Sequence, residues 1–175
     1  MVRTLMPSIF EAYSNSIVAT SYSKDVSLPG ERLGYLVVHP EADEVEGLLG
    51  GLILANRILG FVNAPALMQR VVTHLQGVCV NVEVYQARRD LFYQGLVNAG
   101  YEVIKPRGAF YLFPKSPVAD DVSFVRLLQE ENILVVPGSG FGSPGYFRIA
   151  YCVGKKTIES GMPGFARARK RSLGE

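Results

Sequence analysis

Apolar residues along this chain fall into two kinds of pattern, short runs and amphipathic stretches. Residues 17–20 and 33–38 are short apolar runs bounded by polar or turn residues, which predicts a buried strand at residues 17–20 and a second strand at residues 33–38. Beyond residue 41 the apolar positions recur with a helical period instead. This pattern predicts one helix that starts at residues 41–44 and runs to about residue 59, and two more at residues 66–75 and 81–99.

The rest of the chain alternates between strand-like and helix-like patterns. Strands are predicted at residues 101–105, 109–113, 133–136 and 146–153. A helix capped by Asp120 or Asp121 runs through residue 131, a glycine-rich loop covers residues 137–145, and Thr157 caps the last helix. This alternation is typical of the α/β class, in which a small sheet packs against helices.

Composition and charge argue against several classes of protein. The chain has 175 residues, of which 48% are hydrophobic and 19% charged, so it can bury a core. Its net charge of +2 is too small to indicate a nucleic-acid partner, and we interpret the basic stretch at residues 167–171 as a solvated helix end. Residues 1–10 do not resemble a signal peptide, and the apolar stretch at residues 47–55 is too short to cross a membrane. We therefore expect a cytoplasmic protein that binds neither nucleic acid nor a membrane.

Cysteine and histidine positions give no sign of a disulfide framework or a metal site. Cys79 and Cys152 have no paired spacing, which fits a reducing compartment, and neither has a base nearby in the sequence that would activate it. His39 and His74 lack metal-ligand spacing. No metal site is predicted.

The strongest candidate chemistry lies in the turn between the two predicted strands. There the chain places a lysine, hydroxyls, an arginine and small residues at Ser21, Tyr22, Ser23, Lys24, Gly30, Arg32 and Gly34. Hydroxyls and a guanidinium suit a phosphate, and a lysine between apolar walls would keep more free amine to attack a carbonyl carbon. The pattern therefore indicates a site that binds a phosphate and forms a Schiff base.

This spacing resembles the lysine signature of the class I/II aminotransferases, the aspartate aminotransferase-like enzymes of fold type I that use pyridoxal 5'-phosphate (PLP). Ser27, Leu28 and Gly30 fit the intervening pattern. The resemblance implies that Lys24 holds PLP as a Schiff base and then moves the proton of the substrate. It also implies that Arg32, followed by Ser21 and Ser23, binds the cofactor phosphate.

Three later segments are similar to the same family, namely residues 108–114, 135–142 and 146–151. In that family an arginine on the strand after the glycine-rich loop grips the substrate α-carboxylate, and Arg148 occupies this position. An arginine inside an apolar strand also needs an anionic partner. A structural salt bridge within the same domain is the alternative for Arg148. Tyr35 and Phe110 are expected to pack, and Arg57 to be solvated or salt-bridged.

The resemblance implies the C-terminal half of a fold type I enzyme. Residues 1–40 would be a remnant of the cofactor-binding large domain, residues 41–80 linking helices at the active-site mouth and dimer side, and residues 81–175 the small α/β domain. The missing half normally supplies the aspartate that pairs with the cofactor nitrogen, the ring stack and the phosphate-binding helix. We therefore expect residues 1–40 to pair with a second copy or a missing half, or to be poorly ordered, while the small domain folds alone.

The implied function is transfer of an amino group between an amino acid and a 2-oxo acid, by a homodimer or by this chain with a missing N-terminal half. Two alternatives stay open from the sequence. A PLP-dependent β-lyase or decarboxylase of the same fold would keep the same lysine and arginines. A non-catalytic fragment or interaction module would keep the fold without holding PLP.

Overall fold

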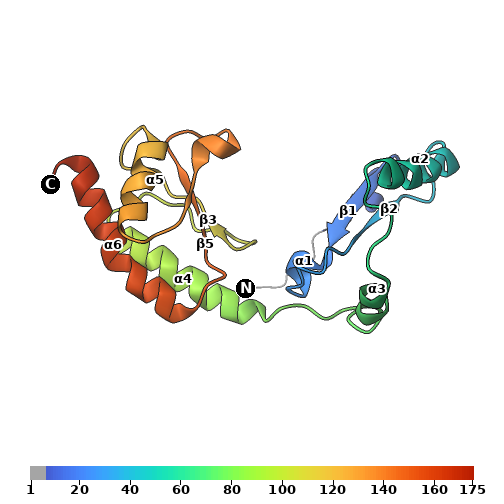
Figure 1. The fold of residues 1–175 in the computed structure, drawn as a ribbon, viewed down its shortest axis with the longest axis horizontal. Helices are drawn as coiled ribbons and strands as arrows, with labels where there is room; N and C mark the ends of the chain where they lie inside the picture. The colour runs from blue at the N-terminus through green and yellow to red at the C-terminus, as the bar shows by residue number, and fades with distance from the viewer. Residues whose placement is uncertain (1–6) are drawn as a thin grey trace. The chain divides into compact units, whose positions relative to one another are not determined.

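A computed structural model describes residues 7–175 of the chain (Figure 1). The chain forms two compact units, an N-terminal unit, Met1–Val80, and a C-terminal unit, Asn81–Glu175. The break after Val80 falls where the sequence suggests that the small domain begins. The assignment of residues 1–40, 41–80 and 81–175 to parts of a fold type I enzyme stays a prediction.

The two predicted strands of the N-terminal unit form an antiparallel pair. Strand β1 (Ile17–Ser21) pairs with β2 (Gly34–Val38), with Ile17 opposite Val38 and Ser21 opposite Gly34. The prediction that the first strand is buried is wrong, because no residue of β1 is buried. No residue of β2 is buried either, and Tyr35 is 49% exposed. Helix α2 contacts β2, but one helix does not cover both faces of a two-stranded sheet.

The outer edges of this pair carry no further strand among residues 7–175. Such edges present unpaired backbone groups to any chain that can add a strand. The expected pairing with a second copy or a missing half concerns these edges, and it stays a prediction.

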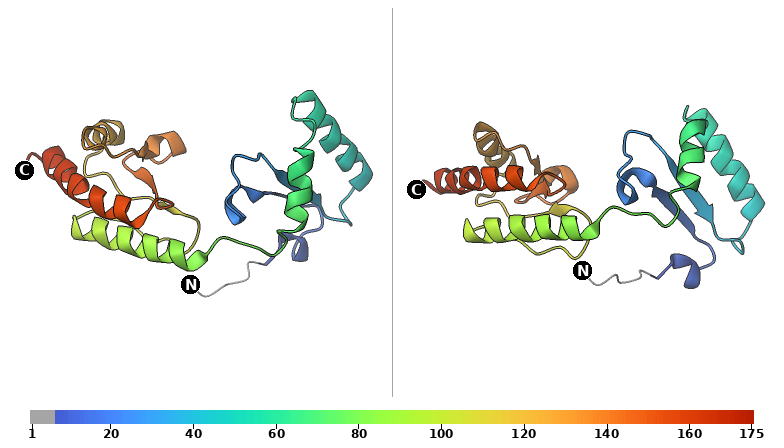
Figure 2. Two further views of the ribbon diagram at one scale, coloured as in Figure 1. Left: turned by 60° about the horizontal axis from the view of Figure 1, so that its bottom comes forward. Right: turned by 90° about the horizontal axis from the view of Figure 1, so that it is seen from below.

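The helices of the N-terminal unit are η1 (Ile9–Glu11), α1 (Tyr22–Asp25), α2 (Val45–Ile58) and α3 (Ala66–Thr73), and Figure 2 shows α2 beside the strand pair. Helix α2 begins later than residues 41–44, where the sequence predicts its start. The Asp43 backbone N–H and carboxylate are both bonded to the Asn15 side chain, at 2.7 and 2.6 Å, and Glu44 has a φ of +55°. These long-range contacts hold residues 41–44 in a turn.

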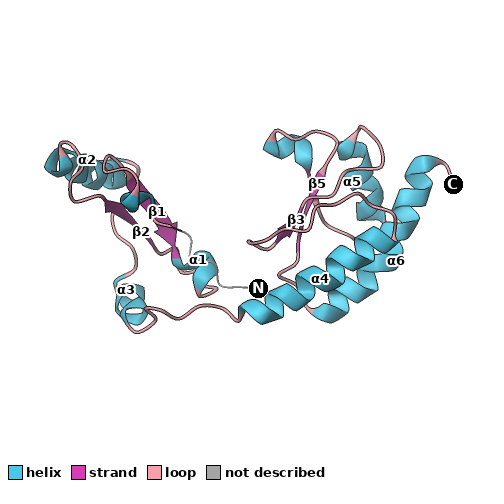
Figure 3. Ribbon diagram, turned by 180° about the vertical axis from the view of Figure 1, so that it is seen from behind, coloured by secondary structure: helices cyan, strands magenta, loops and turns pink. Residues whose placement is uncertain are grey.

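The C-terminal unit is a three-stranded antiparallel sheet that packs on helices. Its strands are β3 (Tyr111–Leu112), β4 (Val136–Pro137) and β5 (Phe147–Ala150), in the order β3-β5-β4. Its helices are α4 (Val82–Asn98), α5 (Asp121–Glu130), η2 (Gly138–Phe141) and α6 (Lys155–Leu173). Figure 3 shows α4 and α6 side by side, and both α4 and α5 contact α6. The predicted α/β class is therefore the class that forms.

Alternation along β5 separates the core of this unit from an opposite, partly exposed face. Phe147 and Ile149 are buried, whereas Arg148 and Ala150 are only partly buried. The core consists of Phe92, Leu96, Tyr101, Leu112, Phe124, Val125, Leu128, Phe147, Ile149, Tyr151, Ile158, Phe165 and Ala168. Because side chains alternate across a strand, Arg148 projects from the face opposite this core.

One predicted strand of this unit does not form, the last helix starts earlier than predicted, and the other strands differ in their bounds from the prediction. Residues 101–105 form no strand, because Tyr101 instead turns its ring into the core and donates its hydroxyl to the Phe165 carbonyl at 2.8 Å. Helix α6 begins at Lys155 with Gly154 as its N-cap, and not at a Thr157 cap.

The basic stretch at the end of α6 is paired with acids of α5 and its C-terminal turn. Arg167 lies 2.6 Å from the Glu131 carboxylate, and Arg171 lies 2.7 Å from that of Glu130. The Arg167 hydrogen bond also lowers the pKa of Glu131. Within residues 7–175 no helix combines the length and the apolar character that a membrane span requires.

Candidate functional site

Lys24 lies in α1, a single helical turn that directly follows β1. Ser21 is the N-cap of this turn, and its hydroxyl accepts the Ser23 backbone N–H at 3.4 Å. Ser, Asp, Asn and Thr are favoured at this position because their side chains satisfy an otherwise unbonded N–H. Lys24 is exposed, so the described residues do not form the apolar walls expected around its amine.

The fold brings Arg32 to the same end of the strand pair as Lys24. The Tyr22 backbone N–H donates to the Leu33 carbonyl at 3.1 Å, and Ser21 lies opposite Gly34. Arg32 has a φ of +51°, and its Nη1 donates to the Pro29 carbonyl at 2.9 Å. Residues 22–33 therefore form a closed loop with the hydroxyls, the amine and the guanidinium at one end of the hairpin.

Gly34 has a steric reason to be glycine in this motif. A Cβ atom built on it would lie 2.6 Å from the Thr20 carbonyl oxygen, a contact that side chains essentially never make. The strand pair at the motif thus depends on a residue without a side chain.

These donors fit the phosphate and the carbonyl group of PLP. The Ser21 oxygen accepts a hydrogen bond from Ser23, which leaves the Ser21 hydroxyl hydrogen to donate. Arg32 uses one N–H in its bond to Pro29, and a guanidinium has five, so further donors can reach an anion. The primary amine of Lys24 is the group that suits the carbonyl carbon of PLP.

Arg148 lies against two aromatic rings in the C-terminal unit. Its guanidinium carbon lies 4.4 Å from the ring centroid of Tyr111 and 4.0 Å from that of Phe141. No carboxylate of residues 7–175 comes within 4.0 Å of it. The described residues therefore do not form the structural salt bridge that was the alternative for Arg148, and among them the two rings are the cation–π partners of its guanidinium.

The stacking rings were not predicted as part of the site. Phe113 extends the group, with its centroid 6.5 Å from that of Phe141 and stacked at 5.7 Å on Tyr146. Alternation in residues 111–113 and 146–148 could have suggested a shared face for Tyr111, Phe113, Tyr146 and Arg148. Phe141 gave no such signal, because it lies in the glycine-rich loop.

Three further residues were predicted to pack or to be solvated, and not to take part in the chemistry. Phe110 packs against the core, in agreement with the expectation. Tyr35 is 49% exposed, and its ring lies 5.7 Å from that of Tyr22. Arg57 is exposed in the last turn of α2.

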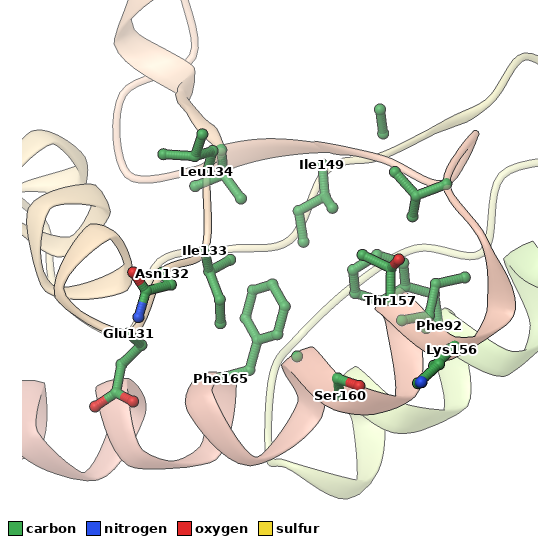
Figure 4. A pocket seen from close by; sticks show the side chains of 15 residues that line it. Phe92, Glu131, Asn132, Ile133, Leu134, Ile149, Lys156, Thr157, Ser160 and Phe165 are labelled. Atoms are coloured by element: carbon green, nitrogen blue, oxygen red, sulfur yellow. The ribbon is translucent and has the colours of Figure 1, made fainter.

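A separate pocket of about 540 Å³ lies in the C-terminal unit (Figure 4). Ile133, Ile149 and Phe165 point into it, with Lys156 and Ser160 at its border. None of the predicted site residues lines this pocket. Residues 7–175 also contain no cluster of three or more potential ligand side chains that could hold a metal ion.

Comparisons with known proteins agree on one family. The family described as "Aminotransferase class I and II" matches residues 3–162. A "Probable aspartate aminotransferase" of Methanocaldococcus jannaschii is 34% identical over 154 residues, which cover 83% of this chain and 40% of that protein. An "Aromatic-amino-acid aminotransferase 2" of Thermococcus litoralis is 30% identical over 90% of this chain and 42% of its own length.

Solved structures give the same result. An amino transferase of Eubacterium rectale is 40% identical with a TM-score of 0.90, over 98% of this chain and 43% of its own. An aspartate aminotransferase of Thermotoga maritima is 25% identical with a TM-score of 0.72, over 91% of this chain and 40% of its own. The chain therefore spans about two-fifths of the length of these relatives. With its α/β fold matching part of fold type I and its sequence matching the family almost throughout, the chain belongs to the class I and II aminotransferases.

Proposed function

We propose that this chain carries the cofactor-anchoring lysine and the carboxylate-binding arginine of a PLP-dependent aminotransferase. The observation that carries the proposal is the pairing of Ser21 with Gly34, which brings Lys24 and Arg32 to one end of the hairpin. Membership of the family supports it, and so does the fit of the donors to the cofactor. The substrates are an amino acid and a 2-oxo acid.

When bound, PLP supplies the electron-accepting ring that lets the α-carbon of an amino acid lose its proton. Lys24 anchors the cofactor covalently through its amine and, once released, takes and returns that proton at its Nζ. Arg32 contributes most to binding the phosphate because a guanidinium offers two parallel donors. The Ser21 hydroxyl follows, and that of Ser23 contributes least.

Arg148 binds the α-carboxylate of the substrate. Its guanidinium carbon lies over the rings of Tyr111 and Phe141, and the N–H edges of the planar guanidinium match a carboxylate bidentately. Since no described acid occupies those edges within 4.0 Å, a bidentate contact with a substrate has no internal competitor.

The active assembly is a homodimer, or this chain with an N-terminal half like that of its relatives, in the cytoplasm. Ile58, Leu59 and Phe61 near the end of α2 are 74%, 68% and 75% exposed. Large exposed apolar side chains in one segment are typical of a surface that another chain covers.

Borohydride trapping tests the cofactor proposal. The purified chain is titrated with PLP and reduced, and the labelled peptide is mapped in the unchanged chain, in Lys24→Ala and in Lys115→Ala. Lys115 is a surface lysine that pairs with Glu102 and serves as the matched control. We expect label on the Lys24 peptide in the unchanged chain and in Lys115→Ala, and none there in Lys24→Ala.

Absence of label at Lys24 in the unchanged chain would contradict cofactor binding by this chain and would favour a non-catalytic fragment. If label is present, product assays with several amino acids and 2-oxoglutarate separate amino-group transfer from β-elimination or decarboxylation. Consumption of the amino acid without formation of glutamate would overturn the assignment as an aminotransferase.

A further inference from the structure

A buried carboxylate contacts the loop that carries Phe141. Asp121, the first residue of α5, is only 4% exposed. Among residues 7–175 no lysine, arginine or histidine lies within 4.0 Å of it. Its Oδ2 accepts the backbone N–H of Ser139 at 2.7 Å. Burial of a carboxylate is costly, so this short charge-assisted bond and the N-terminal dipole of α5 must hold it in place.

The hydrogen bond between Asp121 and Ser139 holds the glycine-rich loop beside Gly138, where the backbone is closely packed. Gly138 donates its N–H to the Tyr146 carbonyl at 2.7 Å and accepts the Ser143 N–H at 3.0 Å. A Cβ atom on Gly138 would collide with the Ser143 carbonyl oxygen and lie 2.7 Å from that of Tyr146. The atoms packed around Gly138 are backbone atoms of Ser143 and Tyr146. The turn therefore cannot shift at Gly138 without breaking its backbone hydrogen bonds to these two residues.

Phe141 belongs to the same short turn as Ser139, within η2 (Gly138–Phe141). A further bond, from the Gly142 N–H to the Ser139 carbonyl at 3.2 Å, closes the turn around Phe141. The position of Ser139 therefore sets the position of the Phe141 ring, which lies 4.0 Å from the Arg148 guanidinium carbon.

We propose that Asp121 is a positioning residue for Arg148. Through Ser139 it holds the turn that places the Phe141 ring against the guanidinium, and so it restricts the position in which Arg148 meets a carboxylate. A long arginine side chain loses conformational entropy when it binds, and a guanidinium that already lies against a ring loses less. The link from Asp121 to Arg148 rests on contacts within one unit, whereas its value for binding substrate rests on the proposed function.

The Nε–Hε signal of Arg148 in the NMR spectrum of the full chain reports this link directly. A proton held over the face of an aromatic ring is shifted upfield, and Arg148→Lys identifies the signal by removing it. We expect Phe141→Leu and Asp121→Ala each to move the signal downfield. We expect the double variant to move it no further than Phe141→Leu alone, because both changes remove the same ring.

Asp120→Ala is the matched control. Asp120 is the N-cap of α5, and it accepts hydrogen bonds from the backbone and hydroxyl of Ser123 but none from Ser139. This variant should weaken the helix without moving the Arg148 signal. A signal unchanged in Asp121→Ala, or one moved equally in Asp120→Ala, would overturn the inference.

Should Asp121→Ala lose the amide spectrum of a folded chain, Asp121→Asn replaces it. The amide keeps an acceptor oxygen but forms a weaker bond. The Ser139 amide proton and the Arg148 signal should then both move, the latter in the direction seen for Phe141→Leu and by less. A change confined to the Ser139 amide would overturn the inference.

Titration with 2-oxoglutarate separates this inference from the proposed function. We expect Asp121→Ala to bind it about three- to tenfold more weakly, with Asp120→Ala unchanged. If Arg148→Lys does not alter binding, the carboxylate role of Arg148 fails while the effect of Asp121 on the Arg148 signal still stands. If Arg148→Lys weakens binding and Asp121→Ala does not, the positioning role of Asp121 fails.

Discussion

Ser21 lies directly opposite Gly34 in the antiparallel pair of β1 and β2, so the two ends of the lysine motif are neighbours in space. All the phosphate-binding candidates and Lys24 lie on the loop that this pair closes. The geometry of the candidate site therefore depends on two strands that have little core beneath them.

Gly34→Ala should open this loop. The added Cβ would meet the Thr20 carbonyl oxygen at 2.6 Å, and a backbone atom cannot move aside cheaply. A cost of about 1–3 kcal/mol is typical of such overpacking. We expect faster hydrogen exchange of the β1 and β2 amides and reduced PLP labelling of Lys24. Gly30→Ala is the control, because a Cβ on Gly30 meets nothing within 4 Å, and equal effects of the two changes would contradict the steric argument.

The C-terminal unit should fold without the N-terminal unit. Every member of the large core cluster lies beyond residue 81, whereas the buried apolar residues of the N-terminal unit are only Leu33, Ala42 and Val72 among those described. We expect a fragment of residues 81–175 to unfold cooperatively on heating, with the unfolding monitored by circular dichroism. We expect a fragment of residues 1–80 to show no such transition. A non-cooperative profile for residues 81–175 would refute the independence of the small unit.

Charged substitutions near the end of α2 should reduce self-association. Ile58 and Phe61 are 74% and 75% exposed, and we attribute their exposure to a surface that another chain covers. Ile58→Lys and Phe61→Lys should shift sedimentation toward the monomer. Ile104→Lys alters a side chain that is 87% exposed in the other unit and should leave association unchanged. A chain that is already monomeric at high concentration would argue against the homodimer.

Acid should weaken the contact between α6 and the C-terminal turn of α5. The Arg167 hydrogen bond lowers the pKa of Glu131 in the folded chain. A lowered folded-state pKa stabilises the fold above the ordinary glutamate pKa of about 4.3, and this contribution disappears as the pH falls through the lowered value. Glu131→Gln should therefore flatten the acid limb of a plot of unfolding midpoint against pH.

Glu83→Gln is the control for this pH dependence, because Glu83 forms no ion pair among residues 7–175. Since Glu131 and Arg167 form a surface pair, the effect should be small and should shrink in high salt. An acid limb that is the same in Glu131→Gln as in the unchanged chain would show that other groups control it.

Local signals were sufficient for most of the helices. Asn81 caps α4 through the N–H groups of Glu83 and Val84, and Gly100 follows its end with a φ of +87°. Asp120 caps α5 in the same way. Such caps are contacts between residues a few positions apart, so a short stretch of sequence contains both partners.

Strands and their burial were predicted less well. Residues 101–105 have a strand-like pattern, but the structure uses Tyr101 to satisfy the Phe165 carbonyl on α6. Strands β1 and β2 form where the sequence predicts them, yet they are not buried. An apolar pattern indicates that a strand can pack against other residues. Which residues pack against it depends on the rest of the assembly.

The sequence by itself determined the family, the order of Lys24, Arg32 and Arg148, and the chemistry that these side chains can perform, because each motif is a set of residue types at fixed spacing. Only the tertiary structure decided that Ser21 pairs with Gly34 and that Asp121 accepts a hydrogen bond from the loop that carries Phe141. It also decided that Arg148 lies against two aromatic rings and not against an acid among the described residues. These contacts join residues distant along the chain, and their partners are selected by strand register and packing, which no local pattern encodes.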